Sequence, residues 1–239
     1  MIKTEYNVYD EYFLFRNVDP DFYADYILPA YLKEELPRDR NSAILDIGCG
    51  FGQMLKALKV EGYKNLTGID ISAEAIESCS EQKLNVEKIV SIANYCHNAR
   101  KKYDFIVMSH VIEHIEKKEI IETLRSIRMQ LLNEGGRIMI MTPNAQSNTG
   151  CYWAYEDFTH TTIFTAGSLF FVLKCAGFKQ VDFIDILGVT GSHPIIKLAK
   201  RILVLLYRAN FNFWNRVTNS SYHRQSPQIF TFELKALAR

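Results

Sequence analysis

The hydrophobic and polar positions of the chain follow two alternating patterns. Short apolar runs are separated by longer stretches in which apolar residues recur every three or four positions. The first pattern is typical of buried strands and the second of amphipathic helices. Strands are predicted at 42–48, 65–71, 86–90, 103–110, 137–142, 180–187 and 228–238. Helices are predicted between them at 52–63, 72–83, 116–132 and 166–177.

The order of these elements predicts the fold class. Strands separated by helices, several of the strands apolar throughout, indicate an α/β domain with a mostly parallel sheet and helices on both faces. Ser72 and Thr165 precede predicted helices and are expected to cap them. We expect this domain to span 40–239, after a Tyr-rich helical lead-in at 1–39, and to carry an insertion at about 190–227.

Composition and charge describe an ordinary globular protein and favour no particular partner. Of the 239 residues, 48% are hydrophobic and 23% are charged, and the net charge is +1. The five cysteines are scattered and form no C-x-x-C pair, which favours a reducing compartment over a disulfide framework or a zinc site. The N-terminus lacks a signal-peptide pattern, and no apolar run reaches the about 20 residues of a membrane span. A cytoplasmic protein is therefore expected.

The stretch "LDIGCGFG" at 45–52 joins the first predicted strand to the first predicted helix. Its glycines are Gly48, Gly50 and Gly52. A dinucleotide fingerprint needs G-x-G-x-x-G, but Gln53 stands at the third position, and the G-K-[ST] ending of a phosphate loop is absent. The glycines therefore predict a tight turn that a ligand can approach closely, without a phosphate-binding motif.

Two acids lie near the ends of the first two strands. Asp46 can accept hydrogen bonds from an ammonium group or from water. Asp70 follows Gly52 by 18 residues, where an acid in a nucleotide-binding α/β fold can accept both ribose hydroxyls. An acidic turn without phosphate-binding residues suits a nucleoside that carries no phosphate. S-adenosylmethionine is a ligand of that kind.

Five motifs in order resemble those of class I S-adenosylmethionine-dependent methyltransferases. They are "ILDIGCGFG", "LTGIDIS", "YDFIVMSHVIEHI", "LLNEGGRIMIMTPN" and "AGF", and together they span about 40–190. The resemblance implies a Rossmann-like, seven-stranded sheet whose last strand runs antiparallel. It also implies cofactor contacts from the glycine loop and its neighbours, namely Asp46, Gly48, Gly50, Gly52, Asp70 and, against the adenine, Ile71.

The chain departs from this family after the third predicted strand. Related enzymes often place an acid there to hold the adenine amine, whereas this chain has "VSIANYCHN". Asn94 is assigned to the cofactor site in place of that acid.

"HVIEHI" contains His110, Glu113 and His114 in an H-x-x-E-H pattern that also occurs in metalloproteases. A metal site of that type needs both histidines on one helical face, but His110 ends a predicted strand. We therefore predict no metal site. The segment is expected to lie beside the cofactor, as in the resembled family, with Glu113 and His114 capping the next helix.

The aromatic stretch "YWAYEDFTHTTIFT" at 152–165 follows the fifth predicted strand, on the side of the sheet where open α/β folds bind ligands. One interpretation is a packed loop with His160 bonded to a backbone carbonyl. The functional interpretation makes His160 the general base for a hydroxyl nucleophile, because imidazole titrates near neutral pH. Asp157 would orient His160, and His110 is the alternative base.

"DFTH…FT…SL" after "TPN" resembles the subset of these enzymes associated with bacterial surface polysaccharides and other glycans. That resemblance implies O-methylation of a saccharide, either a surface polysaccharide or a lipid-linked glycan. Two rivals remain open. One is a small-molecule O-methyltransferase for a phenol, quinone or antibiotic, and the other is a non-catalytic partner subunit that binds the cofactor.

The segment 186–232 contains no acid and six basic residues. Within 194–216 the basic residues share one helical face, and the opposite face carries Ile195, Leu198, Ile202, Leu205 and Leu206. This pattern predicts an amphipathic helix on an anionic membrane surface, which would make the protein peripheral at the inner face of the membrane. The alternative is a helix packed on the domain or on the second subunit of a homodimer. No nucleic-acid partner is expected, because the net charge is small and no recognition motif is present.

Overall fold

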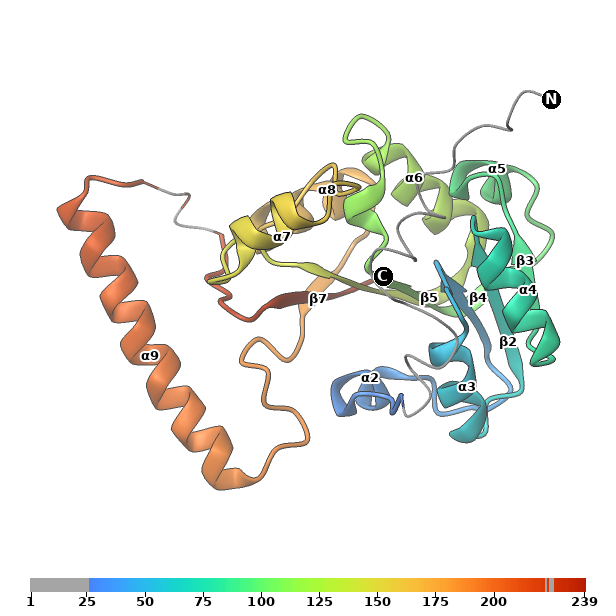
Figure 1. The fold of residues 1–239 in the computed structure, drawn as a ribbon, viewed down its shortest axis with the longest axis horizontal. Helices are drawn as coiled ribbons and strands as arrows, with labels where there is room; N and C mark the ends of the chain where they lie inside the picture. The colour runs from blue at the N-terminus through green and yellow to red at the C-terminus, as the bar shows by residue number, and fades with distance from the viewer. Residues whose placement is uncertain (1–25, 222, 224–225) are drawn as a thin grey trace.

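The computed structural model describes residues 26–221, 223 and 226–239. The strands form a seven-stranded sheet of order β3-β2-β1-β4-β5-β7-β6 (Figure 1). Strand β7 is antiparallel to β5 and β6, and the other pairings are parallel, which confirms the predicted fold class. The strands are β1 (Ala43–Ile47), β2 (Asn65–Asp70), β3 (Val86–Lys88), β4 (Tyr103–Ser109), β5 (Leu132–Pro143), β6 (Val181–Phe183) and β7 (Glu233–Ala238).

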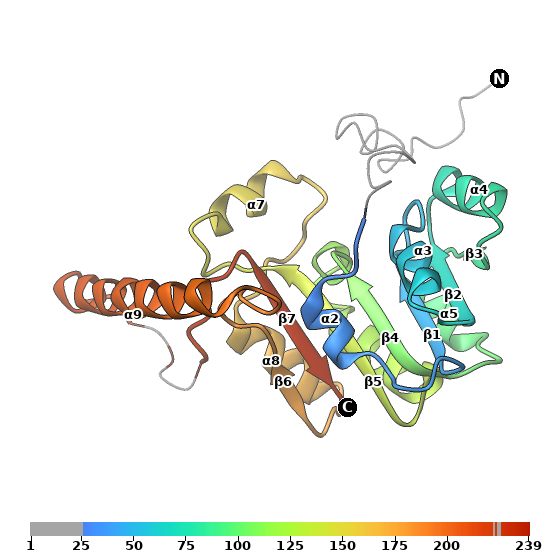
Figure 2. The same cartoon turned by 90° about the horizontal axis from the view of Figure 1, so that it is seen from below.

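Helices cover both faces of the sheet, because successive strand residues point to opposite sides. One core contains Ile44 and Phe105 and packs against α2 (Ala30–Glu35) and α3 (Gln53–Val60). The other contains Leu45 among other strand residues. It packs against α5 (Ile92–His97), α6 (Ile120–Ser126) and α8 (Ala166–Cys175), while α4 (Ala73–Glu81) lies beside β2 and β3 (Figure 2).

The predicted helix caps are confirmed. The Ser72 hydroxyl accepts a hydrogen bond from the Ala75 amide at 3.2 Å, which starts α4. Thr165 and Ser168 form a reciprocal capping box at the start of α8. These caps satisfy amide groups that have no partner inside the helix.

Several element boundaries differ from the predicted ones. The helix predicted at 116–132 is the shorter α6 followed by a π-helical turn, Ile127–Leu131, and β5 then begins at once. Helices α5 and α7 (Gly150–Glu156) were not predicted, because helices of six and seven residues are too short to show periodicity. Strand β6 ends early because Asp185, at φ 44°, turns the chain away from the sheet.

The insertion before β7 forms α9 (Pro194–Val217), which projects away from the sheet (Figures 1 and 2). None of its 24 residues is buried. Within the described part of the chain, no helix is both long enough and apolar enough to cross a bilayer. Of the lead-in predicted at 1–39, α2 is the helical part that can be seen, and 1–25 lie outside the described residues.

Candidate functional site

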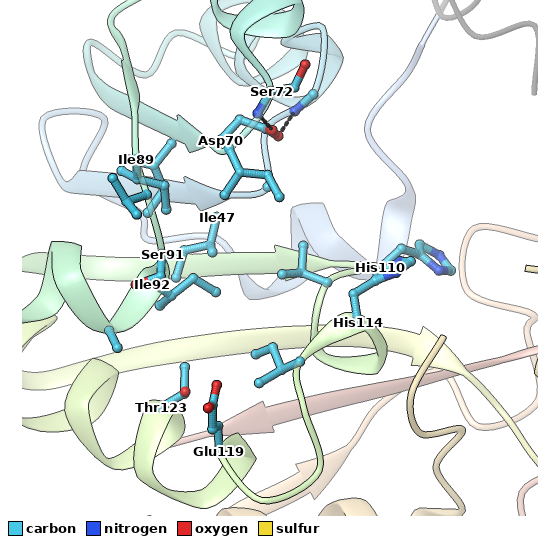
Figure 3. Close-up of a pocket in the computed structure, with 18 of the residues that line it drawn as sticks. Ile47, Asp70, Ser72, Ile89, Ser91, Ile92, His110, His114, Glu119 and Thr123 are labelled. Carbon is cyan, nitrogen blue, oxygen red and sulfur yellow. Dashed lines mark hydrogen bonds between the residues drawn. The ribbon is translucent and has the colours of Figure 1, made fainter. Parts of the chain in front are cut away.

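A cavity of about 470 Å³ opens at the carboxyl ends of β1, β2 and β4 (Figure 3). The order of the strands reverses here: β2 lies on one side of β1, and β4 lies on the other side of β1. Ligands of open α/β sheets bind at this switch point. The cavity is therefore the candidate cofactor site.

The glycine loop forms one wall of this cavity. Gly48 and Gly50 line it with φ angles of 74° and 49°, which residues with side chains adopt rarely. A Cβ atom on Gly48 would lie 2.3 Å from a methyl group of Val111. Gly52 does not line the cavity; a Cβ there would lie 2.5 Å from Leu84, so its role is the packing behind the loop.

Asp70 connects the glycine loop to the start of α4. Its Oδ2 accepts a hydrogen bond from the Gly50 amide at 2.9 Å, and its Oδ1 accepts one from the Ser72 amide at 2.8 Å (Figure 3). Burial raises the pKa of the Asp70 carboxyl. Each oxygen has a second lone pair. The carboxylate can therefore position the loop and accept two ribose hydroxyls at the same time.

The far end of the cavity is apolar. Ile89, Ser91 and Ile92 line it (Figure 3) together with Ile71, and this mostly apolar lining suits an adenine ring. Asn94 lies outside the lining. Its amide donates to the Ser91 hydroxyl, because the unpredicted helix α5 begins here and carries Asn94 to its exposed side. Ser91 and Ile92 thus occupy the place that sequence reasoning assigned to Asn94.

A second cavity of about 430 Å³ adjoins the first, since Gly48, Gln53, His110 and His114 line both. Asp46 lines the second cavity and is 2% exposed. Burial, and then the neighbouring charge of Asp70, raise the pKa of Asp46 to about 7. A cationic group bound beside it would favour its charged form.

The opposite wall of the second cavity comes from distant parts of the chain. Trp153 belongs to α7, Asp157 and His160 follow α7, and Phe232 and Glu233 lie at the start of β7. The predicted residues Asp157 and His160 therefore face the same space as Asp46. The second cavity is the candidate acceptor site.

His110 ends β4 in the left-handed region, at φ 53°, and its amide donates to the Met141 carbonyl. Its Nε2 lies 2.9 Å from Glu233 Oε1 and its Nδ1 lies 3.3 Å from Glu113 Oε1. Burial opposes the charged ring, but the two carboxylates outweigh it and raise the pKa of His110 to about 10. A ring that stays protonated at neutral pH is poorly suited to act as a general base.

Glu113 is fully buried in a 3₁₀ turn, Ile112–His114. Its Oε2 accepts a hydrogen bond from the Thr142 hydroxyl at 3.1 Å, and its backbone carbonyl accepts one from the Thr161 amide at 2.8 Å. Burial raises the pKa of Glu113, but His110 outweighs this and holds it below its ordinary value. The predicted helix-capping role is wrong, because α6 starts later, after Glu119.

His160 and Asp157 lie next to each other beyond α7. The Nδ1 atom of His160 donates to the Trp153 carbonyl at 2.7 Å, and its Nε2 lies 3.5 Å from Asp157 Oδ2. The side chain of His160 is 5% exposed. The hydrogen bond to the Trp153 carbonyl is the contact expected of a packed loop. The contact with Asp157 is the one expected from the functional interpretation. The loop contains both.

His114 and Thr159 complete this cluster, and sequence reasoning did not assign them to it. His114 Nδ1 lies 2.9 Å from the Thr159 hydroxyl oxygen, and that hydroxyl donates to Asp157 Oδ1 at 2.6 Å. The rings of His114 and His160 have centroids 4.7 Å apart. Burial lowers the pKa of His114.

The ligand atoms of Glu113, His114 and His160 all lie within 4.8 Å of one another, a grouping that can hold a metal ion. The absence of a metal site was predicted from His110, Glu113 and His114 alone, whereas the folded chain brings His160 from another segment to Glu113 and His114. A signal was present, because "EH" follows the fourth strand and "DFTH" follows the fifth. The carboxyl ends of adjacent parallel strands lie at the same edge of a sheet, so these two segments can meet.

The family model for methyltransferase domains matches residues 19–182, which is more than half of the chain. The chain therefore belongs to the methyltransferase-domain family. Its sheet order, its glycine loop and Asp70 are those of a class I S-adenosylmethionine-dependent methyltransferase domain, and S-adenosylmethionine is the cofactor that the first cavity fits.

The curated relatives match short parts of the chain. An uncharacterised protein of Methanocaldococcus jannaschii is 32% identical over 83 residues, covering 34% of this chain and 36% of the relative. A ubiquinone biosynthesis O-methyltransferase of Hydrogenovibrio crunogenus is 28% identical over 80 residues, covering 31% and 33%. The chain thus spans about a third of the length of these two proteins.

Solved structures share the fold over nearly the whole chain. A SAM-dependent methyltransferase from Archaeoglobus fulgidus aligns with a TM-score of 0.64 and 23% identity, covering 97% of this chain and 99% of the other. The structure of DhpI with SAM aligns with a TM-score of 0.58 and 13% identity, covering 99% and 100%. At these identities the likeness concerns the fold.

The raised pKa of Asp46 predicts that cofactor binding depends on pH. Asp46 lines the acceptor cavity beside Gly48 and Gln53, which line both cavities, so we expect the cationic end of the cofactor to reach it. Asp46 must be ionised to pair with that charge, so below its pKa of about 7 binding must expel a proton. The dissociation constant for S-adenosylmethionine should rise by as much as about tenfold for each pH unit below 7. Calorimetric titrations between pH 5.5 and 8 measure this slope. The Asp46→Asn variant should bind weakly without the slope, and a slope retained in that variant would contradict the assignment.

The ion pairs of His110 predict how stability depends on pH. In the folded chain His110 keeps its proton up to about pH 10, whereas in the unfolded chain it loses that proton near pH 6.5. The contribution of His110 to the free energy of unfolding is therefore complete below pH 6.5 and is lost as the pH rises toward 10. Denaturant unfolding should show the largest difference between wild type and His110→Gln below pH 6.5, and a smaller one at each step upward. His97→Gln, on exposed α5, is the matched control. A difference that does not change with pH would refute the pairing.

Proposed function

We propose that this protein transfers a methyl group from S-adenosylmethionine to a hydroxyl oxygen of a saccharide. The observation that carries the proposal is the second cavity, which adjoins the cofactor cavity and contains His160, His114 and Asp157. A hydroxyl is a poor nucleophile until its proton leaves, so a site for it needs groups that handle the proton. The cofactor supplies the leaving group, and the chain aligns the acceptor and excludes water.

We assign the activation of the acceptor hydroxyl to His160 with Asp157. Nδ1 of His160 donates to the Trp153 carbonyl, which orients the ring and leaves Nε2 to accept a proton. Nε2 lies 3.5 Å from Asp157 Oδ2, so Asp157 stabilises the imidazolium that forms instead of orienting the ring as predicted. His110 is a weaker candidate, because its two ion pairs keep it protonated. In this proposal His110 shapes the junction of the two cavities.

Aromatic rings in the acceptor cavity support a flat, hydroxylated acceptor. Trp153 and Phe232 line it with ring centroids 5.5 Å apart, and the Tyr31 ring closes the side nearest α2. Such rings can stack on a sugar face or on a phenol. The saccharide is preferred because of the resemblance of "DFTH…FT…SL" to glycan-modifying enzymes, and the ubiquinone O-methyltransferase among the relatives favours a phenol as the second candidate.

Helix α9 supports a substrate held at a membrane surface. Its domain-facing side makes polar and aromatic contacts, in which Tyr207 donates to Asn148 Oδ1 at 2.6 Å and Phe211 packs on Phe230. The other side leaves large apolar side chains exposed, namely Ile195, Leu198, Ile202, Leu205, Leu206, Phe213 and Val217. Because the helix already rests on the domain through its polar side, the apolar stripe has no cover within the described chain.

Charge and position together favour an anionic lipid surface for this stripe. Lys197, Lys200, Arg201 and Arg208 lie on the side of α9 opposite the stripe, where Lys200 donates to the Gly188 carbonyl at 2.9 Å and Arg208 to the Gln228 carbonyl at 3.2 Å. Basic residues beside an apolar face are typical of interfacial helices. Phe158, which is 99% exposed, follows α7 and is next in the chain to Asp157, which lines the acceptor cavity. A membrane contact through α9 would bring that cavity close to a lipid-linked glycan.

Replacing His160 tests the proposed reaction. His160→Ala should lower the turnover of labelled S-adenosylmethionine with glycan fractions by about 10²–10⁴, the usual worth of acid–base assistance. Affinity for the cofactor should change little, since His160 lines only the acceptor cavity. His97→Ala is the control for histidine loss. Full turnover in His160→Ala would point to an acceptor that is already ionised, such as a phosphate.

Vesicle flotation tests the surface assigned to α9. The protein should float with vesicles that contain phosphatidylglycerol and lose binding as salt rises. Replacing Lys197 and Arg201 by Gln should weaken binding by about 1 kcal/mol for each residue. Replacing Leu198 and Leu206 by Gln should abolish it. Lys59→Gln with Lys64→Gln is the charge-matched control. If the protein is a dimer in solution and does not bind vesicles, packing of α9 between two subunits is favoured.

A further inference from the structure

The cluster at the junction of the two cavities has the donor set of a metal site. We propose that Glu113, His114 and His160 bind one divalent cation of the Zn²⁺, Mn²⁺ and Co²⁺ class, and that this cation holds the acceptor by two adjacent hydroxyl oxygens. The inference rests on the proposed function, because it concerns the same acceptor site. Two imidazoles and a carboxylate suit such ions better than Mg²⁺, which prefers oxygen ligands.

The hydrogen bonds of both histidines orient them as metal ligands. A carbonyl only accepts, so Nδ1 of His160 carries the proton that it shares with the Trp153 carbonyl, and Nε2 is the ligand atom. The Thr159 hydroxyl donates its hydrogen bond to Asp157. Its oxygen therefore accepts a hydrogen bond from His114 Nδ1. Nε2 is therefore also the ligand atom of His114. Metal-binding histidines are usually held in this way through their other nitrogen.

Glu113 contributes a buried carboxylate in which one oxygen, Oε1, has only an ion-pair contact. Thr142 donates to Oε2, but Oε1 has no hydrogen bond in the described chain, and its nearest charged neighbour is His110 Nδ1 at 3.3 Å. The ion pair with His110 leaves Oε1 with lone-pair capacity for a second cationic partner, which a metal ion can supply.

The spacing of the group permits binding after a small inward movement. The three ligand atoms lie within 4.8 Å of one another. Two ligands of a tetrahedral zinc ion are about 3.4 Å apart, so a bound cation would draw these side chains together. His114 lines both cavities, which places the cation at their junction, where an oxygen bound to it can face the methyl group.

Three protein ligands leave positions open for an acceptor, as in catalytic metal sites. A hydroxyl oxygen on the cation loses its proton more readily, and Asp157, beside His160, accepts that proton. The oxygen then forms a bond to the methyl carbon while the bond from carbon to sulfur breaks and leaves a neutral thioether. A second open position favours an acceptor with two adjacent hydroxyls, such as a sugar diol.

Cobalt binding tests the site directly. Tag-free protein titrated with Co²⁺ should show visible absorption bands that saturate at one ion per chain. The Thr159→Val variant removes a hydrogen bond to a ligand and should weaken cobalt binding by about 10–100-fold. Loss of a ligand itself should weaken it further, in each of the variants His114→Ala, His160→Ala and Glu113→Gln. His97→Ala should bind like wild type. Circular dichroism and binding of S-adenosylhomocysteine establish that each variant is folded.

The outcomes separate this proposal from the proposed function. Methyl transfer that a chelator abolishes and Zn²⁺ or Mn²⁺ restores supports the cation. Absence of cobalt binding in folded wild-type protein, or binding that all three ligand variants retain, overturns it. If activity then survives chelation but is lost in His160→Ala, direct proton transfer to His160 holds and the O-methyltransferase assignment stands. If no methyl is transferred to any hydroxylated acceptor, the proposed function itself fails.

Discussion

The buried carboxylate of Glu113 is the group on which the site depends. It lies with no exposed surface beside the imidazolium of His110, and it accepts a hydrogen bond from Thr142 on β5. Its backbone carbonyl accepts from Thr161, in the loop that carries His160. One residue therefore joins the end of β4, the end of β5 and the loop beyond α7. Loss of one partner would leave a buried charge unpaired, which is far costlier than loss of a surface pair.

His110 makes this arrangement possible through its backbone. A φ of 53° turns the chain sharply at the end of β4, so that its ring lies between Glu113 and Glu233 instead of continuing the strand. A non-glycine residue with positive φ is strained and persists where its surroundings impose it. Here two carboxylates hold the ring, and the Met141 carbonyl holds the amide.

The two cavities are built on different principles. One wall of the cofactor cavity is formed by backbone, with Gly48 and Gly50 lacking side chains and Asp70 held by two amides. The acceptor cavity is formed by side chains from α2, α7, the loop after α7 and β7. A backbone-built site suits a ligand that does not vary, whereas a wall of side chains on a loop can change with the acceptor. The same domain can thus keep its cofactor and alter its substrate.

The sequence by itself determined the sheet, the glycine loop and the acid at the end of β2. These features depend on consecutive elements, and a parallel strand–helix–strand unit connects in essentially one way. Asp157 and His160 were also predictable as a pair, since they are three residues apart. The short helix α5 escaped detection, and with it the exposed position of Asn94.

Only the tertiary structure decided which groups meet across the acceptor cavity. His114 and Thr159 are 45 residues apart, and His110 and Glu233 are 123 apart. Their contacts exist because β7 inserts next to β5 and the loop after α7 folds back over the turn that follows β4. Local patterns specify how a chain enters and leaves each element. Which loops then touch depends on the order and twist of the whole sheet, and no short stretch of sequence contains that information.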